Sequence, residues 1–264
     1  MLKLILGFFF SFIISFFSYR KKSLTLSGFI SATFLGTSLY FFGDIRFFVI
    51  LISFFASSSI ITKFKKNLKE TPEEITEKSG NRDYTQVIST GIIPLIFTVF
   101  YYFTKDISFI IGFVTSVSVA NSDTWASEIG VLSKSDPISV ISFKRVPRGL
   151  SGGISALGLI SSFLGSVFIS AIFAILFHGE NKVFLITIIS ITGGFLGSLV
   201  DSILGASLQA KYISASDKIT EKRFSDGKEN NLKSGLAFIN NNAVNLISSA
   251  VVSVSATMIF VNIL

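Results

Sequence analysis

Three acidic side chains lie close to the ends of long apolar segments, where a charge is energetically unfavourable. Asp123 and Glu128 belong to the stretch NSDTWASEIG, and Asp201 belongs to GGFLGSLVDSILGASLQ. A charged side chain inside a membrane segment costs about 2.5–3.5 kcal/mol on insertion scales. Carboxylates can hold a divalent cation, so we predict that these three acids are catalytic and ligate a metal ion. The alternatives are that Asp201 pairs with a basic residue inside the protein and that the other two are solvated helix-end charges.

A basic, glycine-rich stretch follows the first two acids, at the start of the next apolar segment. It reads FKRVPRGLSGG (143–153), and its candidate phosphate-binding residues are Lys144, Arg145, Arg148, Gly149, Ser151, Gly152 and Gly153. Exposed backbone amides at a helix start attract anions, and Ser151 can cap such a helix. The stretch therefore predicts a phosphate site. The alternative is a flexible basic loop that only orients the chain, and the P-loop pattern G-x-x-x-x-G-K-[ST] is absent from the sequence.

Further polar residues gather beside other apolar segments. Four asparagines stand in NNNAVN (240–245), although asparagine is a poor helix former and is costly in lipid. Asn245 follows Asn241 by four residues and Asn242 by three, so it shares a helix face with each. These amides could ligate a cation, read a base or join helices. We predict that the three bind the substrate or the nucleotide phosphates, with the joining of helices as the structural alternative. Arg82 precedes another apolar segment, and it either joins the phosphate site or pairs with a neighbouring acid.

The composition indicates an integral membrane protein. Of the 264 residues, 50% are hydrophobic and only 15% are charged, against about 25% in soluble proteins. The mean hydropathy is +0.67. The chain has no cysteine and one histidine, which excludes disulfides, thiolate metal sites and a histidine-rich metal site within one chain. Basic loops that orient a membrane protein explain the net charge of +7 better than a nucleic-acid partner does. We therefore expect a lipid bilayer as partner and no nucleic acid.

Apolar runs, each close to the ~20 residues that cross a bilayer, predict an all-α, polytopic transmembrane helix bundle with no β-sheet. We expect about eight spans, with six to eight allowed, in a single domain of residues 1–264. The predicted spans are 1–18, 24–42, 45–62, 86–103, 107–121, 154–177, 183–204 and a span within 236–264. The sequence TPEE (71–74) also has the form of a helix start, which predicts a short helix in the loop after the third span.

The distribution of charge predicts the orientation of these spans. The loops after the first, third, fifth and seventh spans contain 3, 6, 4 and 6 Lys and Arg residues, which is 19 of the 23 in the chain. The other side has Lys3, Arg46, Lys105 and Lys182. By the positive-inside rule the basic loops face the cytosol. We therefore expect a plasma-membrane protein whose two termini lie outside and whose cytosolic loops are 19–23, 63–85, 122–152 and 205–235.

Together, the motifs resemble a family of polytopic membrane proteins whose plant member is the phytyl-phosphate kinase of tocopherol synthesis. The resemblance is carried by NSDTWASEIG, FKRVPRGLSGG, GSLVDSILGASLQ and NNAVNLIS, and also by TLSGFISATFLG and NRDYTQVIST, so it covers nearly the whole chain. More distantly, an Asp-x-x-Ala-x-x-x-Gly element at Asp123, Ala126 and Gly130, followed by the basic turn, is similar to CTP-using polyprenol kinases and CDP-diacylglycerol synthases.

The resemblance implies a kinase that transfers the γ-phosphoryl group of CTP, or of another nucleoside triphosphate, to an isoprenyl monophosphate with Mg²⁺ as cofactor. The residues that fall on matching motif positions are Asp123, Glu128, Lys144, Arg145, Gly149, Gly152, Gly153, Asp201, Asn241 and Asn245. Arg148 and Leu150 depart from the Pro and Thr expected in the turn, and the missing hydroxyl puts one phosphate contact in question. The prenyl chain length, the donor nucleotide and a homo-oligomeric assembly are left open.

Other functions fit parts of the same pattern. A prenol kinase, or a cytidylyltransferase that forms a CDP-lipid, would use related substrates, and release of pyrophosphate instead of CDP would identify nucleotidyl transfer. A membrane transporter would use the intramembrane acids and amides as a substrate path. Its site is expected near the bilayer midplane, whereas these groups cluster near one interface. A purely structural membrane protein leaves the polar clusters unexplained.

Overall fold

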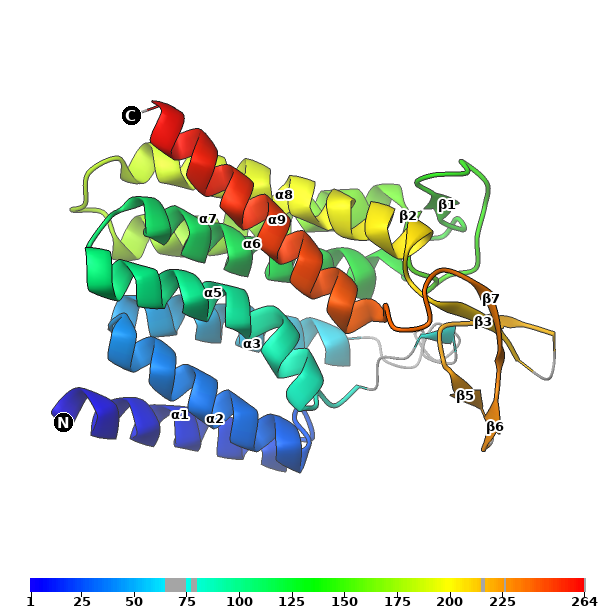
Figure 1. Ribbon diagram of the computed structural model, residues 1–264, viewed down its shortest axis with the longest axis horizontal. Coiled ribbons are helices and arrows are strands. Elements are labelled where there is room, and N and C mark those ends of the chain that lie inside the picture. The colour runs from blue at the N-terminus through cyan, green and yellow to red at the C-terminus, as the bar shows by residue number, and fades with distance from the viewer. Residues whose placement is uncertain (65–74, 77–79, 215–216, 226, 264) are drawn as a thin grey trace.

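Eight long helices run side by side between the two ends of the molecule, in the part of the chain that the structure describes (Figure 1). The computed structural model describes residues 1–64, 75–76, 80–214, 217–225 and 227–263. The helices are α1 (Leu2–Arg20), α2 (Leu26–Phe42), α3 (Ile45–Lys63), α5 (Tyr84–Thr104), α6 (Ser108–Gly130), α7 (Ala156–Leu176), α8 (Val183–Ser207) and α9 (Asn241–Ile263). The helix start predicted at 71–74 lies outside the described residues.

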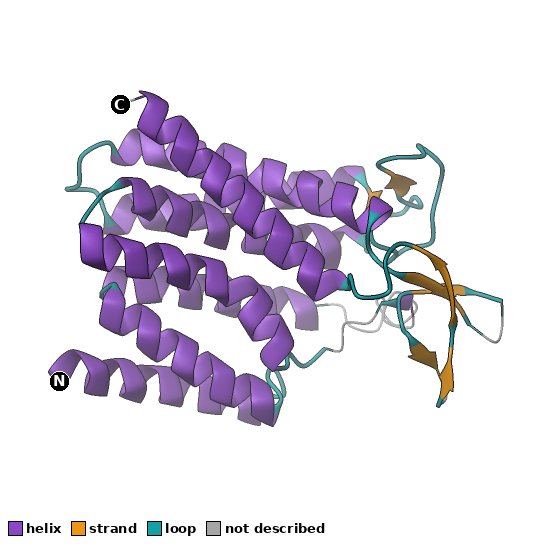
Figure 2. Cartoon of the chain, in the orientation of Figure 1, coloured by secondary structure: helices purple, strands orange, loops and turns teal. Residues whose placement is uncertain are grey.

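These helices have the length and composition expected of membrane spans. Among the described helices, α1, α3, α5, α7, α8 and α9 are long and apolar enough to cross a bilayer. The other two are α2, which has 17 residues, and α6, which is rich in serine and carries Asp123 and Glu128. Both termini lie at one end of the bundle, and the short strands gather at the other (Figure 2). The prediction of an all-α, polytopic membrane bundle is confirmed.

The expectation that the chain contains no β-sheet is wrong, because short strands form in the segments between helices. Here β1 (Ile138–Ser139) pairs with β2 (Gly153–Ile154), and β5 (Phe224–Ser225) pairs with β6 (Lys228–Glu229). In a third sheet β3 (Lys211–Ile213) lies between β4 (Ile219–Thr220) and β7 (Asn231–Ser234). All pairs are antiparallel. Strands of two to four residues are too short to leave an alternating pattern in the sequence.

Two helices extend farther than the apolar runs that predicted them. The helix α6 continues without a break to Gly130, so the first nine residues of the predicted loop 122–152 are helical. The helix α8 continues to Ser207, which shortens the predicted loop 205–235 in the same way. The polar residues at the ends of the apolar runs therefore lie on helices and not in loops. The helical backbone fixes the direction in which their side chains point.

The start of α7 also differs from the prediction. Its N-cap is Ser155, whose hydroxyl oxygen accepts a hydrogen bond from the Gly158 N–H at 3.1 Å. The prediction that Ser151 caps this helix is wrong, because a turn and the strand β2 stand between Ser151 and the helix. Side-chain caps of the same kind begin α2, α3 and α5, at Thr25, Asp44 and Asp83. Such caps satisfy amides that have no partner within the helix.

The helix α6 is enclosed by the rest of the bundle. It contacts α3, α5, α7, α8 and α9, and every residue from 110 to 122 is buried. Neighbouring glycines allow this close approach: a Cβ at Gly194 would overlap the Ser118 hydroxyl, and a Cβ at Gly197 would overlap the Val119 side chain. Small residues at helix contacts are typical of membrane bundles, where backbones pack closely.

Polar groups inside the bundle bind one another across helices. The Asn121 Nδ2 donates to the Gly165 carbonyl oxygen at 2.8 Å, and its Oδ1 accepts from the Ser57 hydroxyl at 2.9 Å. One amide thus joins α6 to both α7 and α3. Because the hydrocarbon region offers no water as partner, these bonds hold α6 in one rotational position about its axis.

We expect Gly28→Ala to destabilise the fold. An added Cβ would overlap the Arg82 carbonyl oxygen, which accepts the Thr25 N–H at 3.0 Å and ties α2 to the start of α5. Overpacking of this kind costs about 1–3 kcal/mol, so the protein in detergent should unfold at a lower temperature. The control is Gly179→Ala, where a Cβ meets nothing within 4 Å. Equal unfolding temperatures for the two variants would contradict the expected contact.

Candidate active site

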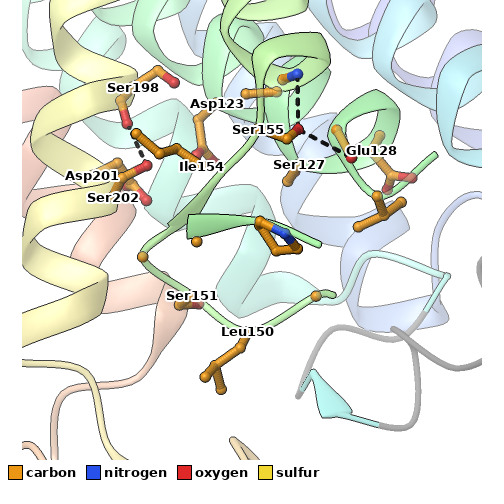
Figure 3. Close-up of a pocket in the computed structure, with 18 of the residues that line it drawn as sticks. Asp123, Ser127, Glu128, Leu150, Ser151, Ile154, Ser155, Ser198, Asp201 and Ser202 are labelled. Carbon is orange, nitrogen blue, oxygen red and sulfur yellow. Dashed lines mark hydrogen bonds between the residues drawn. The ribbon is translucent and has the colours of Figure 1, made fainter. Parts of the chain in front are cut away.

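A cavity of about 170 Å³ lies at the end of the bundle where the strands gather. Residues of α6, α7, α8 and α9 line it, together with the glycine-rich turn before β2 (Figure 3). The predicted site residues that it brings together are Asp123, Glu128, Arg148, Gly149, Ser151, Gly152, Gly153, Asp201 and Asn241. Segments distant in the sequence thus meet in one place, with carboxylates and backbone amides facing a shared space.

Asp123 and Glu128 both reach this cavity from α6, although the helix does not break between them. A spacing of five residues does not place two side chains on one helix face. The last turns of α6 pass along the cavity wall, however, and Ser127 between them also lines it. The Thr62 hydroxyl at the end of α3 donates to Glu128 Oε1 at 2.9 Å, which fixes the second carboxylate.

Asp201 faces the cavity from α8 and is held from behind by α9. The side chain is 7% exposed, and its Oδ2 accepts the Ser248 hydroxyl at 2.9 Å. In the orientation of the Asn245 side-chain amide that satisfies both its oxygen and its nitrogen, Nδ2 also donates to Asp201 Oδ2 at 2.9 Å. Asn245 therefore positions the acid instead of lining the cavity. No local feature of the sequence singles out Ser248 among the many serines of the predicted helices.

The glycine-rich turn adopts a conformation that only glycine reaches without strain. Gly149 has φ +89° and Gly152 has φ +85°. A Cβ at Gly152 would overlap the backbone and side chain of Ala206, so the turn packs directly on α8. The Ser151 N–H donates to the Glu221 Oε1 at 2.6 Å. The turn therefore already presents an amide to a negatively charged oxygen, which is the kind of group that a phosphate would offer.

Glu221 was missed by the sequence analysis. It is 5% exposed and lines the cavity from the segment after β4. Its own N–H donates to the Ile75 carbonyl oxygen at 2.9 Å. Burial lowers the pKa of nearby Lys211, and the Glu221 carboxylate partly offsets that effect. In the sequence Glu221 is one acid among the basic residues of KITEKR, so no local signal separated it from a solvated charge.

Two predicted phosphate ligands do not reach the cavity. Lys144 and Arg145 are exposed beside β1, where the Lys144 carbonyl oxygen accepts the Ser139 N–H at 2.8 Å and turns the chain back. Neither residue lines the cavity, and the alternative of a basic orienting loop fits their position. Arg148 lines it, but its guanidinium also pairs with Asp136 at 3.4 Å and donates to the Lys134 carbonyl oxygen at 2.9 Å.

The remaining predicted residues take other positions. The Asn242 Nδ2 donates to the Thr85 hydroxyl at 2.8 Å and joins α9 to α5, which is the helix-joining alternative. Arg82 lies outside this cavity, and its guanidinium stands over the rings of Phe54 and Phe55. Burial lowers the pKa of Arg82 to about 10, and the nearby Glu128 carboxylate opposes this shift. Arg82 therefore remains a cation at neutral pH.

The acids suit a magnesium ion that arrives with phosphates. Among the described residues there is no group of three or more acids close enough to hold a metal by themselves. Asp123, Glu128 and Asp201 thus line one cavity without forming a closed three-ligand cage. Mg²⁺ commonly takes one or two carboxylates and completes its shell with water and substrate phosphates. The donor set fits that mode of binding.

The bundle of membrane-spanning helices, with an acidic cavity and a glycine turn at one end, defines a polytopic integral membrane protein. The chain belongs to the family described as integral membrane protein DUF92, whose profile matches residues 9–253. This match covers every residue that lines the cavity.

Several relatives share most of this chain. It is 32% identical over 285 residues to Protein PGR of Arabidopsis thaliana, covering 98% of each chain. It is 29% identical over 197 residues to an uncharacterized membrane protein of Methanocaldococcus jannaschii, covering 74% of this chain and 78% of the relative. It is 26% identical over 241 residues to Protein VTE6, chloroplastic, of Arabidopsis thaliana, covering 89% of this chain and 65% of the relative. No solved structure matches the chain.

We expect Gly152→Ala to destabilise the protein more than Gly227→Ala. Both glycines have positive φ, at +85° and +75°, so the backbone strain of about 1–2 kcal/mol is shared. Only at Gly152 would the new Cβ also collide with α8, through Ala206, whereas Gly227 is surrounded by open space. Thermal unfolding in detergent should show the difference as a larger loss at 152. If both variants lose the same stability, the turn does not pack on α8 as described.

Proposed function

We propose that the protein is a Mg²⁺-dependent kinase that transfers the γ-phosphoryl group of CTP, or of another nucleoside triphosphate, to a prenyl monophosphate. The observation that carries this proposal is the meeting of Asp123 and Asp201 with the Gly149–Gly153 turn in one cavity at the end of a membrane bundle. Carboxylates, and backbone amides that already bind a carboxylate oxygen, are the groups needed to place two phosphorylated substrates.

The chemistry requires little beyond positioning. A prenyl monophosphate is an anionic nucleophile, since the second pKa of a phosphomonoester is near ~6. Its oxygen would form a bond to the γ-phosphorus while the bond from that phosphorus to the bridging oxygen breaks, and CDP would leave with the electron pair. No general base is required. This suits a chain whose single histidine, His178, lies in the loop between α7 and α8.

Different residues of the cavity would bind the metal ion and the phosphates. Asp123 and Asp201 would hold Mg²⁺. Bound together with the nucleotide, the ion would neutralise part of the phosphate charge. Ser248 and Asn245 keep Asp201 in one orientation. The N–H groups of Leu150, Ser151 and Gly153 already donate within the protein. The Gly149 and Gly152 amides and the guanidinium of Arg148 would therefore bind phosphate oxygens. In this arrangement catalysis comes from fixed charges and dipoles and not from a proton transfer.

We propose that the site faces the cytosol at the plasma membrane. The loops at its end of the bundle contain most of the Lys and Arg residues, which the positive-inside rule places in the cytosol. Both termini, at the other end, would then lie outside. A cytosolic mouth gives access to the nucleotide, while the acceptor lipid arrives from the bilayer.

We expect purified protein with geranylgeranyl monophosphate, Mg²⁺ and CTP to form the diphosphate and CDP in equal amounts. Parallel reactions with ATP determine the donor, and mass spectrometry identifies both products. Pyrophosphate together with a CDP-lipid would identify nucleotidyl transfer instead. Product from free prenol alone would identify a prenol kinase, and flux of a substrate into proteoliposomes without nucleotide would identify a transporter.

We expect Asp123→Asn and Asp201→Asn to lower turnover by at least ~100-fold, as the loss of one electrostatic group in an active site commonly does. The matched control is Asp217→Asn, an exposed acid on the same side of the bundle that does not line the cavity. All three variants should insert into membranes and elute from a sizing column like the parent protein. Near-normal turnover in both cavity variants would remove these acids from the mechanism.

A further inference from the structure

A second cavity lies inside the bundle, among α1, α2, α3 and α5. Its volume is about 50 Å³, and its walls are mostly apolar, with Leu35, Phe48, Leu51 and Ile52 among the lining residues. It shares no lining residue with the acidic cavity. The part of α3 that lines it extends from residue 48 to residue 55, which is about 10 Å along a helix. The cavity is therefore narrow and follows the direction of the membrane spans.

One charged residue, Arg82, lines this apolar space at the end nearer the predicted cytosolic side. Its backbone is fixed, because its N–H donates to the Ser23 carbonyl oxygen and its carbonyl oxygen accepts the Thr25 N–H, both at 3.0 Å. Its guanidinium carbon stands 5.4 Å from the ring centre of Phe54 and 5.6 Å from that of Phe55. A rigid segment thus directs a cation toward the mouth of an apolar cavity.

The Arg82 guanidinium has N–H donors that no acceptor among the described residues uses. It forms no hydrogen bond or ion pair with any residue that the structure describes, and it stands over the two rings. Arg82 is partly buried, and cation–π contacts return less than it costs to take an ion out of water. An arginine fork matches the oxygens of a phosphate in a bidentate manner. An anion at this position would therefore offset the cost of burial.

The surroundings specify what kind of anion fits. The cavity behind Arg82 is apolar, so the ligand combines an anionic head with a hydrocarbon chain. The volume is about a third of the ~150 Å³ of an apolar cavity that binds benzene, so the space takes no more than the start of one chain and excludes the two chains of a phospholipid. Arg82 is also attracted to Glu128, which lines the acidic cavity. A head group at Arg82 would therefore stand between the two cavities.

We infer that this cavity receives the leading part of a single-chain prenyl monophosphate, with the phosphate on Arg82 and the chain between α1, α2, α3 and α5. The inference rests on the proposed function only in identifying this lipid as the phosphoryl acceptor. The remaining chain lies in the bilayer beside the bundle. Arg82 then selects the head group, and the cavity wall selects the width of the chain.

The first test uses the wild-type protein, so it does not depend on how a variant folds. Geranylgeranyl monophosphate with a diazirine in its first isoprene units is bound in detergent, irradiated and mapped by mass spectrometry. Adducts on residues 48–55 of α3 or 87–91 of α5 support the inference. Adducts confined to outward-facing residues of the bundle, or labelling that excess unmodified lipid does not compete away, overturn it.

The second test compares variants in equilibrium binding of geranylgeranyl monophosphate and, separately, of CTP. Arg82→Gln should weaken lipid binding at least ~10-fold, as the loss of a charge-assisted hydrogen bond does, and Arg82→Lys should retain part of it. Ala32→Leu, which fills the cavity without changing charge, should weaken lipid binding and leave CTP binding unchanged. The control Lys228→Gln removes an exposed cation on β6 and should change neither.

These results separate the inference from the proposed function. Labelling inside the cavity without phosphoryl transfer would support the lipid site and contradict the proposed kinase activity. Transfer to the lipid together with full binding by Arg82→Gln and Ala32→Leu would retain the kinase and overturn the lipid site.

Discussion

The burial of α6 is the constraint on which the rest of the structure depends. Five helices surround it, and glycines such as Gly165, Gly194 and Gly197 let their backbones approach it closely. The hydrocarbon region provides no water for polar groups, so Asn121 must bind neighbouring helices, and it does so on two sides. A helix held in this way cannot rotate without breaking those bonds. Its polar end is therefore presented to the cavity in a single orientation.

The acidic cavity takes its geometry from this fixed helix. Asp123 and Glu128 lie on the last turns of α6, beyond its buried part. Asp201 faces them from α8, where the Ser248 hydroxyl of α9 donates to it. The glycine turn closes the space because it packs on Ala206 and binds Glu221. Glu128, Asp201 and the turn at Ser151 are each supported by a partner on another element. Such support lets charges be placed before a substrate arrives, which is what phosphoryl transfer demands of a protein.

Basic residues serve two different purposes in this protein. Exposed ones such as Lys144 and Arg145 lie outside the cavities and contribute to the excess of positive charge at one end. Partly buried ones such as Arg82 and Lys211 have lowered pKa values because burial removes part of their hydration. The first kind orients the chain in the membrane. The second kind offers charge at places where an anion would be held most strongly, since the local dielectric is low.

The sequence by itself determined the class of fold and pointed to Asp123, Glu128 and Asp201 in the cavity, but not to Glu221. Long apolar runs require helices in a bilayer, and a carboxylate such as Asp201 is too costly there to be accidental. Only the tertiary structure decided which polar groups meet. The contact between Ser151 and Glu221 joins residues 70 positions apart, and no local pattern encodes it. The same holds for Ser248 beside Asp201 and for the short strands, because each depends on how loops return to the bundle and not on the composition of any one segment.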